Sequence, residues 1–296
     1  TRSLRINHEN LRLRDEGLVA SVDEMVADRA AKQTGISRAE FSRGGVTPPP
    51  IFTPYKLREM VLENRIMVSP MCMYSAEDGL IGDWHLVHIG SRAMGGAGLI
   101  MAESTAVSAE GRISPGDSGL YNEKHVEAWR RVTDFVHESG YAKIGVQLSH
   151  AGRKASTRLQ WEGGDTAPLE KRSENWPIMA ASPIPYSPAN ATPAEMSRGD
   201  MDQIIGEFVT AAGRAQDAGF DMLELHCAHG YLLNSFLSPK TNVRTDDYGG
   251  SMENRLKFPI EVKWTGKEPM LVDSQEILDR HMHRCKKHQV YRFQKY

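Results

Sequence analysis

Cysteine is scarce in this chain, and long apolar runs are missing from it. The 296 residues contain three cysteines, Cys72, Cys227 and Cys285, which are too few and too scattered for a disulfide framework. No apolar stretch is long enough to span a bilayer, and the sequence has no cleavable signal region. We therefore expect a protein of the reducing cytoplasm that does not enter a membrane.

Neither sign of charge is in clear excess. Lys and Arg number 36 and Asp and Glu 38, for a formal net charge of −2, which argues against affinity for nucleic acid or an anionic membrane surface. A hydrophobic share of 40% and a charged share of 25% are typical of a globular protein. The length of the chain allows a substantial core.

The first part of the chain differs from the rest in composition. Residues 1–40 are polar and predicted to be helical in part. Residues 42–50 combine glycine with a run of three prolines, which is typical of a linker. We place a domain boundary near residue 47, so that residues 1–46 form a polar N-terminal extension.

Beyond the linker, short apolar runs alternate with helical patterns. The runs are residues 66–68, 99–102, 144–146 and 222–225. Apolar residues recur with helical spacing over 126–136 after Asn122, and over 201–212 after Asp200, two predicted N-caps. This order predicts right-handed crossovers and a parallel sheet.

After the fourth run the pattern continues for one helix and then fails. Residues 258–262 look like a helix, whereas residues 263–296 have no strand–helix rhythm. The connector between Gly152 and Met201 is too long for an ordinary loop, so we expect it to shape a site.

Polar or reactive residues follow each of the four runs. Cys72, Ser104 and Gln147 follow the first three, and the segment His226–Tyr231 follows the fourth. The carboxyl ends of parallel strands gather at one mouth, where two imidazole N–H groups can hold a carbonyl oxygen and a phenol can deliver a proton. A thiol, a hydroxyl and an amide around such a mouth suit a planar, hydrogen-bonding ligand such as an isoalloxazine ring.

Other interpretations of these residues exist. His226 and His229 could bind a metal, but no third ligand or H-E-x-x-H helix accompanies them, and both could be purely structural. Gly95–Gly98 could cradle a phosphate, yet a tight turn into the following strand is favoured. Zinc could also be bound in the tail, where the candidate ligands are His281, His283, Cys285 and His288.

Four motifs give a specific resemblance. Ser69–Tyr74, Gly145–Arg153, His226–Leu232 and Phe236–Ser251 resemble, in order and spacing, the motifs of the Old Yellow Enzyme family of NADH:flavin oxidoreductases. The match covers about residues 51–262. This region is most similar to the C-terminal domain of bifunctional salicylyl-CoA 5-hydroxylase-like flavoproteins. Residues 1–15 of this sequence resemble the end of the flavin monooxygenase part of those proteins.

The resemblance implies a fold and a domain plan. The family fold is a (β/α)8 TIM barrel that holds FMN at its mouth, so this α/β chain would form the N-terminal half of an incomplete parallel barrel. Residues 1–46 would be a remnant of an upstream monooxygenase domain plus linker, and residues 47–262 the FMN oxidoreductase barrel. Residues 263–296 resemble nothing in the family, whose four further units carry an arginine near the flavin and the FMN-phosphate loops. We therefore expect the chain to be truncated.

The resemblance also assigns roles to individual residues. Flavin contacts would come from Ser69, Pro70, Met71, Cys72, Ser104 and Gln147. His226 and His229 would hold the substrate carbonyl oxygen beside Tyr74, and Tyr231 would protonate the α-carbon as flavin N5 delivers hydride to the β-carbon. NADH or NADPH would reduce FMN, the substrate would be an α,β-unsaturated carbonyl compound or CoA thioester, and FAD would occur only with an upstream monooxygenase domain. The alternative is an inactive fragment that self-associates as a homo-oligomer without flavin.

Overall fold

The computed structural model describes residues 15–163 and 175–264. The helices are α2 (Glu16–Thr34), α3 (Arg38–Phe41), α4 (Asp83–Met94), α5 (Glu123–Ser139), α6 (Arg198–Asp217), α7 (Leu232–Leu237) and α8 (Met252–Trp264). The strands are β1 (Tyr55–Leu57), β2 (Met60–Leu62), β3 (Met67–Val68), β4 (Leu99–Ala106), β5 (Lys143–Ser149), β6 (Met179–Ala180), β7 (Ala194–Glu195) and β8 (Met222–Leu225). Short 3-10 turns are η1 (Arg43–Gly45), η2 (Pro50–Phe52), η3 (Gly152–Lys154) and η4 (Gln160–Glu162).

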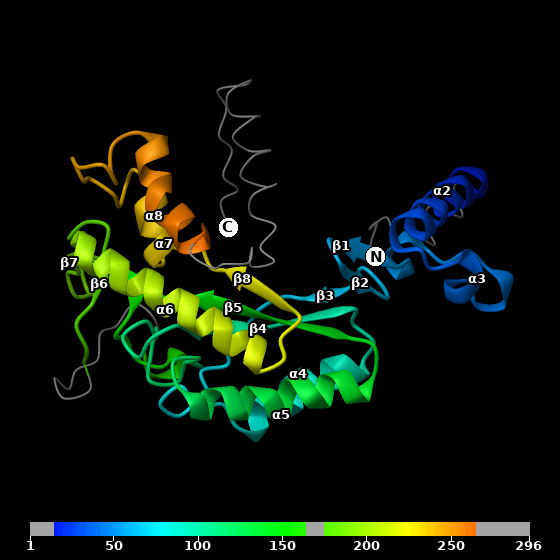
Figure 1. Cartoon of the computed structure of the whole chain (residues 1–296), viewed down its shortest axis with the longest axis horizontal. Coiled ribbons are helices and arrows are strands. Elements are labelled where there is room, and N and C mark those ends of the chain that lie inside the picture. The colour runs from blue at the N-terminus through cyan, green and yellow to red at the C-terminus, as the bar shows by residue number, and fades with distance from the viewer. Residues whose placement is uncertain (1–14, 164–174, 265–296) are drawn as a thin grey trace, which may run out of the picture.

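The four predicted runs form one parallel sheet, in the order β3-β4-β5-β8 (Figure 1). Each crossover between neighbouring strands contains a helix, as parallel pairing requires. The predicted strands are confirmed. A four-stranded parallel sheet that does not close within the described residues fits the incomplete (β/α)8 barrel predicted from the sequence.

One face of this sheet is apolar and covered by helices. Ile144, Val146 and Leu148 alternate along β5 and are fully buried in the main core, together with Trp129 of α5 and Phe208 of α6. Successive side chains of a strand point to opposite faces, so the residues between them face the other way. This helix-covered face supplies most of the apolar burial that stabilises the sheet.

The opposite face, which would line the barrel, changes character along the strands. At its amino end Met101 lies across Gly145, where a Cβ would meet the methionine sulfur at 2.5 Å. The β1-β2 hairpin covers this end through Leu62. Toward the carboxyl end the side chains become polar, as Gln147 and Ser149 show. The hairpin therefore covers the amino end of the sheet. The polar side chains lie at the carboxyl end, which would form the mouth of the barrel.

The helix termini confirm one cap and correct another. Asn122 caps α5, because its Oδ1 accepts the N–H of His125 at 3.1 Å. The prediction of Asp200 as the cap of α6 was wrong. Ser197 is the N-cap, and Asp200 is the third helical residue, whose carboxylate accepts the Ser197 N–H at 2.7 Å. Both residues form a capping box, which the sequence reading missed.

The glycine run before β4 is the tight turn that the sequence favoured. It joins the end of α4 to Leu99. A Cβ at Gly98 would lie 2.4 Å from the carbonyl oxygen of Asn64, so only glycine allows this close approach. The backbone N–H groups here serve the sheet, because those of Gly98 and Leu99 both donate to the carbonyl of Ile66.

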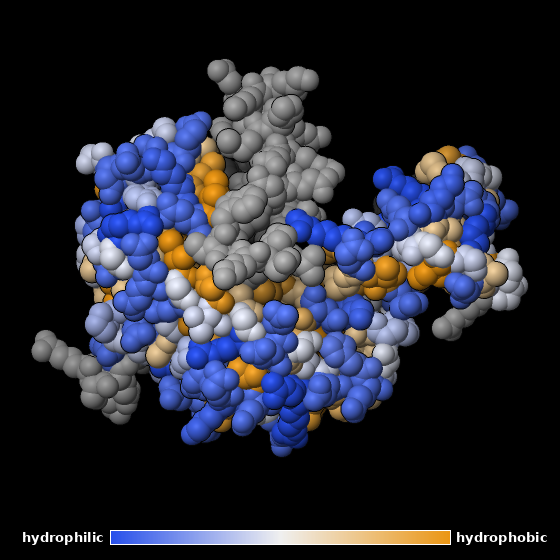
Figure 2. All heavy atoms as spheres, in the orientation of Figure 1, coloured by the Kyte–Doolittle hydropathy of each residue, from blue (hydrophilic) through white to orange (hydrophobic). Residues whose placement is uncertain are grey.

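The N-terminal extension forms helices beside the hairpin. Figure 1 shows α2 and α3 projecting away from the sheet, and α2 packs against β1 and η2. In Figure 2 hydrophobic residues gather along this connection, where Ile51 and Phe52 are exposed. Arg38 donates to Thr47 at 2.8 Å, so the predicted linker contacts the helical part. The boundary near residue 47 stays a prediction.

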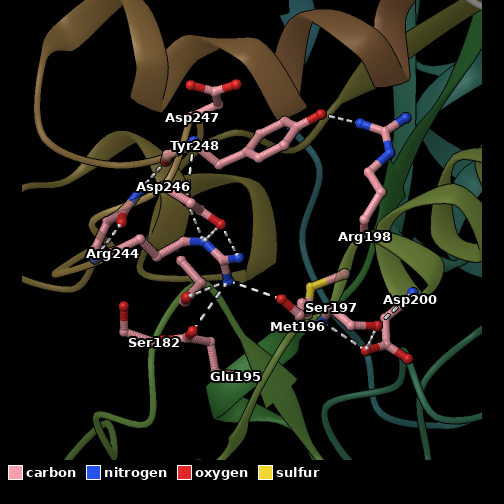
Figure 3. A network of polar contacts seen from close by, with 12 residues as sticks. Ser182, Glu195, Met196, Ser197, Arg198, Asp200, Arg244, Asp246, Asp247 and Tyr248 are labelled. Carbon is pink, nitrogen blue, oxygen red and sulfur yellow. Dashed lines mark hydrogen bonds and ion pairs between the residues drawn. The ribbon is translucent and has the colours of Figure 1, made fainter.

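Arg244 ties the long connector to the segment after α7. Its guanidinium donates to the carbonyls of Ala181 at 3.1 Å and Met196 at 2.8 Å, which flank β6 and β7, and it pairs with Asp246 (Figure 3). The Arg244 side chain is only 7% exposed. Arg244 thus anchors the described part of the connector, residues 175–201, to the segment that follows α7.

Candidate active site

The predicted cofactor residues meet at the carboxyl end of the sheet. Ser104 of β4 pairs in register with Gln147 of β5, which pairs with Glu224 of β8. The Gln147 side chain is buried and donates to Glu224 Oε1 at 2.5 Å. His226, two residues beyond Glu224, is on the same face by strand alternation. The thiol segment after β3, the hydroxyl, the amide and the imidazoles therefore share one rim.

A β-bulge places Ser104 on this rim. Ala102 pairs with Val146 and Ser104 with Gln147, so Glu103 is an extra residue in β4. The extra residue reverses the alternation and turns the Ser104 side chain to the Gln147 face. Its hydroxyl lies 2.5 Å from that of Ser149. Without the bulge, Ser104 would point toward the helices.

Cys72 is held against β4 as a neutral thiol. Its sulfur is hydrogen-bonded to the backbone of Ser104 and to the side chain of Tyr74, while burial, followed by the charges of Asp117 and Glu103, raises the pKa of the thiol to about 12. A protonated thiol can donate a hydrogen bond to a ligand edge, whereas a thiolate could only accept.

The remaining residues of this segment are more open. Ser69 and Met71 are exposed, the latter to 45%, and Pro70 is half-buried. Tyr74 has a φ of 51° and accepts a hydrogen bond from Gln160 at 3.2 Å. The structure therefore brings Cys72, Ser104 and Gln147 together and leaves Ser69, Pro70 and Met71 along the open side of the rim. Their assignment to the flavin stays a prediction.

His226 and His229 form a hydrogen-bonded relay. The N–H of Ala228 donates to His226 Nδ1 at 3.2 Å, so the proton of the neutral imidazole is on Nε2. His226 Nε2 lies 3.3 Å from His229 Nδ1 and donates to it, which leaves His229 Nε2–H as the outward donor. The structure thus joins the two rings in series, whereas the sequence leads us to expect two separate donors to one oxygen. Their roles toward a substrate stay a prediction.

The turn that carries His229 needs a left-handed backbone. His229 and Gly230 have φ values of 57° and 78°, a conformation that favours glycine and is tolerated by histidine and asparagine. This turn brings the exposed His229 ring back over the buried His226 ring, with centroids 5.0 Å apart. Local backbone geometry therefore sets the relay.

Tyr231 and Lys154 complete the cluster. The Tyr231 ring packs edge-on to His226 with centroids 4.7 Å apart. Lys154 Nζ lies 4.8 Å from the Tyr231 ring centroid and 3.5 Å from the carbonyl oxygen of His229. The sequence reading missed Lys154 and Glu224. Glu224 interrupts an apolar strand, a signal that could have identified it, while Lys154 is placed only by the fold.

Burial gives two histidines a pH-dependent effect on stability. Burial lowers the pKa of His150 to about 4, and burial followed by the charges of His229 and Lys154 lowers that of His226 to about 4. Between pH 6.5 and 4 the unfolded chain binds more protons at these sites, so their stability contribution is lost as the pH falls. Asp117, whose pKa burial raises to about 7, acts in the opposite direction and partly offsets them.

We predict that His150→Gln flattens this pH dependence. His150 Nε2 is buried without a hydrogen-bond partner, so protonation in the folded state is costly. Removing one such histidine should reduce the slope of unfolding free energy against pH by about 1.4 kcal/mol per pH unit between pH 4.5 and 6. Urea unfolding at several pH values measures this, and an unchanged slope contradicts the burial of the ring.

The described part of the chain contains no group of three or more His, Cys, Asp or Glu residues arranged to hold a metal ion. The tail residues considered for zinc lie outside the described residues. In the ranges 15–163 and 175–264, no helix combines the length and apolarity needed to cross a membrane.

Comparisons with known proteins identify the family of this chain. Residues 50–265 match the NADH:flavin oxidoreductase / NADH oxidase family. The chain is 46% identical over 214 residues to an NADPH dehydrogenase of Geobacillus sp. (strain WCH70), covering 72% of this chain and 58% of that protein. It is 42% identical over 238 residues to an NADPH dehydrogenase of Bacillus subtilis (strain 168), covering 78% and 65%.

Solved structures with a similar fold agree with this family assignment. Morphinone reductase superposes with a TM-score of 0.63 at 32% identity, covering 72% of this chain and 57% of that one. Old Yellow Enzyme from Pichia sp. superposes with a TM-score of 0.67 at 28% identity, covering 80% and 68%. The chain spans about three fifths of the length of its relatives. On its sequence and its half-barrel fold, this chain belongs to the NADH:flavin oxidoreductase / NADH oxidase family, the Old Yellow Enzyme family.

Proposed function

We propose that this chain is an FMN-dependent NAD(P)H oxidoreductase of the ene-reductase type, which reduces α,β-unsaturated carbonyl compounds. One observation carries the proposal: the His226–His229 relay lies at the same end of the sheet as Cys72, Ser104 and Gln147. A carbonyl-binding donor beside a planar-ring platform is what reduction of a conjugated carbonyl needs.

The rim residues fit an isoalloxazine ring. The ring edge alternates N–H, N and C=O groups, and the rim offers a neutral Cys72 thiol, the Ser104 hydroxyl and the Gln147 carboxamide, all capable of donating. One N–H of the Gln147 carboxamide donates to Glu224. The second N–H and the carbonyl oxygen can therefore bind a ligand. When bound, FMN would supply the hydride that it receives from NADH or NADPH.

The protein groups would bind the carbonyl and move a proton. His229 Nε2–H would donate to the substrate carbonyl oxygen, and His226 would hold His229 in the tautomer that presents this N–H. Negative charge that develops on the oxygen would strengthen this bond, which can lower the barrier by a few kcal/mol. Tyr231, beside His226, would deliver a proton to the α-carbon.

The proposal also covers the substrate class, an associated monooxygenase domain and the cellular compartment. A CoA thioester substrate and an upstream monooxygenase domain with FAD would fit the resemblance of residues 1–15. The two free cysteines that the structure describes, Cys72 and Cys227, are compatible with the reducing cytoplasm.

We expect the purified chain to become yellow on reconstitution with FMN and to oxidise NADPH in the presence of 2-cyclohexen-1-one. Gln147→Leu should weaken FMN binding about tenfold, because it removes the carboxamide from a buried rim. Flavin fluorescence titration measures the affinity. A chain that remains colourless with excess FMN would contradict the proposed function.

A second candidate is a fragment that self-associates without flavin. In the part of the chain that the structure describes, β8 pairs on one side only, with β5. An open strand edge can pair with another chain, so a homo-oligomer would form through β8. Sedimentation of the flavin-free chain over a range of concentrations tests this candidate, and a monomer at all concentrations would eliminate it.

A further inference from the structure

Glu103 is a buried carboxylate that the proposed reaction does not use. It is the extra residue of the β-bulge in β4, and its side chain is 3% exposed. Bulges often redirect a side chain beside an active site. Here the bulge turns Ser104 to the rim and leaves the preceding carboxylate to contact other elements.

Both oxygens of Glu103 lie close to a nitrogen of another element. His85, in the first turn of α4, lies with its Nε2 2.7 Å from Glu103 Oε1. The N–H of Gly82 donates to His85 Nδ1 at 3.3 Å, so the proton of the neutral ring is on Nε2, the nitrogen that faces Glu103 Oε1. This contact is a close polar approach and not an aligned hydrogen bond. The N–H of Met73 donates to Glu103 Oε2 at 2.6 Å. Glu103 thus bridges α4 and the segment that follows β3.

This bridge holds the stretch of backbone that carries the rim thiol. Met73 follows Cys72 directly and precedes Tyr74, whose left-handed φ of 51° gives the chain a sharp turn. Residues 69–76 contain no helix or strand, so their conformation depends on individual contacts. A charge-assisted hydrogen bond to the Met73 N–H is a strong one.

We propose that Glu103, fixed by His85, is a positioning residue that holds Cys72–Tyr74 in the conformation that receives the flavin edge. The inference rests on the proposed function for its ligand, but the support itself is a property of the flavin-free chain. Burial of a carboxylate beside an imidazole and a backbone N–H is unfavourable, because the carboxylate loses its hydration. Support of the rim is a function that accounts for a carboxylate at this buried position. The same charge also favours the neutral form of Cys72, because it raises the pKa of the thiol.

The test compares two buried carboxylates near Cys72. Glu103→Gln replaces one oxygen by an amide donor, so the side chain can no longer place an oxygen both beside His85 Nε2 and on the Met73 N–H. Asp117→Asn is the matched control, because Asp117 also raises the pKa of Cys72 but accepts from Ile113 and Ser114 instead of Met73. At pH 8.5, above the pKa of about 7 of Asp117, both variants lose a negative charge, whereas only Glu103→Gln loses the hydrogen bond to the Met73 N–H.

We expect Glu103→Gln to weaken FMN binding about tenfold, and Asp117→Asn to change it less than about twofold. In the flavin-free protein labelled with 15N-methionine, hydrogen exchange of the Met73 amide should be at least about tenfold faster in Glu103→Gln. Equal weakening by both variants, or unchanged exchange at Met73, would overturn the proposal.

Two further outcomes separate the support from the proposed function. If the unaltered chain binds no FMN, the proposed function fails, and exchange at Met73 still decides whether Glu103 holds the segment. If Glu103→Gln does not fold, His85→Asn serves instead, because it removes the partner of Glu103 and leaves the carboxylate. His85→Asn should accelerate Met73 exchange several-fold more than it accelerates the exchange of β5 core amides, which report unfolding of the whole chain. No acceleration beyond that of the core amides would count against the support.

Discussion

Replacing His229 with alanine is expected to lower kcat/KM for 2-cyclohexen-1-one by about a hundredfold. The reason is that His229 Nε2–H is the outward end of the relay and would be the donor to the substrate oxygen. His226→Ala should have a loss of similar size, because without His226 Nε2–H the tautomer of His229 is no longer fixed.

The double variant discriminates between a relay and two independent donors. Groups that act as a unit give non-additive losses, so His226→Ala combined with His229→Ala should lose little more than either single change. Independent donors would multiply to about ten-thousandfold. Stopped-flow measurement of the oxidation of the reduced flavin by the enone gives the rate of hydride transfer to the substrate, separately from the rate of flavin reduction by NADPH.

His229→Asn is the matched control. Asparagine tolerates the left-handed φ of 57° at this position, and its amide can donate to a carbonyl oxygen. We expect it to retain at least about a tenth of the activity. Activity of His229→Ala equal to that of the unaltered chain would contradict a role for His229 in carbonyl binding.

Replacing Arg244 with leucine is expected to reduce the free energy of unfolding by about 3 kcal/mol. The buried guanidinium donates to the carbonyls of Ala181 and Met196 and pairs with Asp246 and Glu195 (Figure 3). Leucine would leave both carbonyls without these donors. Because they flank β6 and β7, the connector should loosen first, with faster hydrogen exchange over residues 178–196.

Arg198→Leu provides the comparison. Arg198 also makes ion pairs, with Asp202 and Glu261, but its side chain is 50% exposed. Exposed pairs contribute little, so we expect a loss below about 1 kcal/mol. Urea unfolding of both variants measures the difference. Equal losses would show that the buried position of Arg244 adds nothing to the stability of the connector.

The mouth of the sheet could be predicted because it depends on strand order. Alternating strand and helix patterns require parallel pairing, and parallel strands bring their carboxyl ends together. Cys72 and Gln147 therefore had to approach the segment His226–Tyr231 once the four runs were recognised, whereas Ser104 reaches the rim only through the β-bulge. The α5 cap at Asn122 follows from local preference and was also correct.

Contacts between residues far apart in the sequence could not be predicted in the same way. The direction of the hydrogen bond between the two histidines depends on the Ala228 N–H. Lys154 meets Tyr231 because η3, at the start of the connector, packs against α7. Asp200 looked like a cap because a capping box places an acid three residues after the true cap, Ser197.

The sequence by itself determined the parallel sheet, the family and the rim on which reactive side chains gather, because these depend on periodicity and on motifs that are local in the chain. Only the tertiary structure decided how those side chains are used. The extra residue in β4 turns Ser104 to the rim and frees Glu103 to bridge His85 and Met73. Such a bridge joins a strand, a helix and a loop, and its geometry exists only after all three have packed.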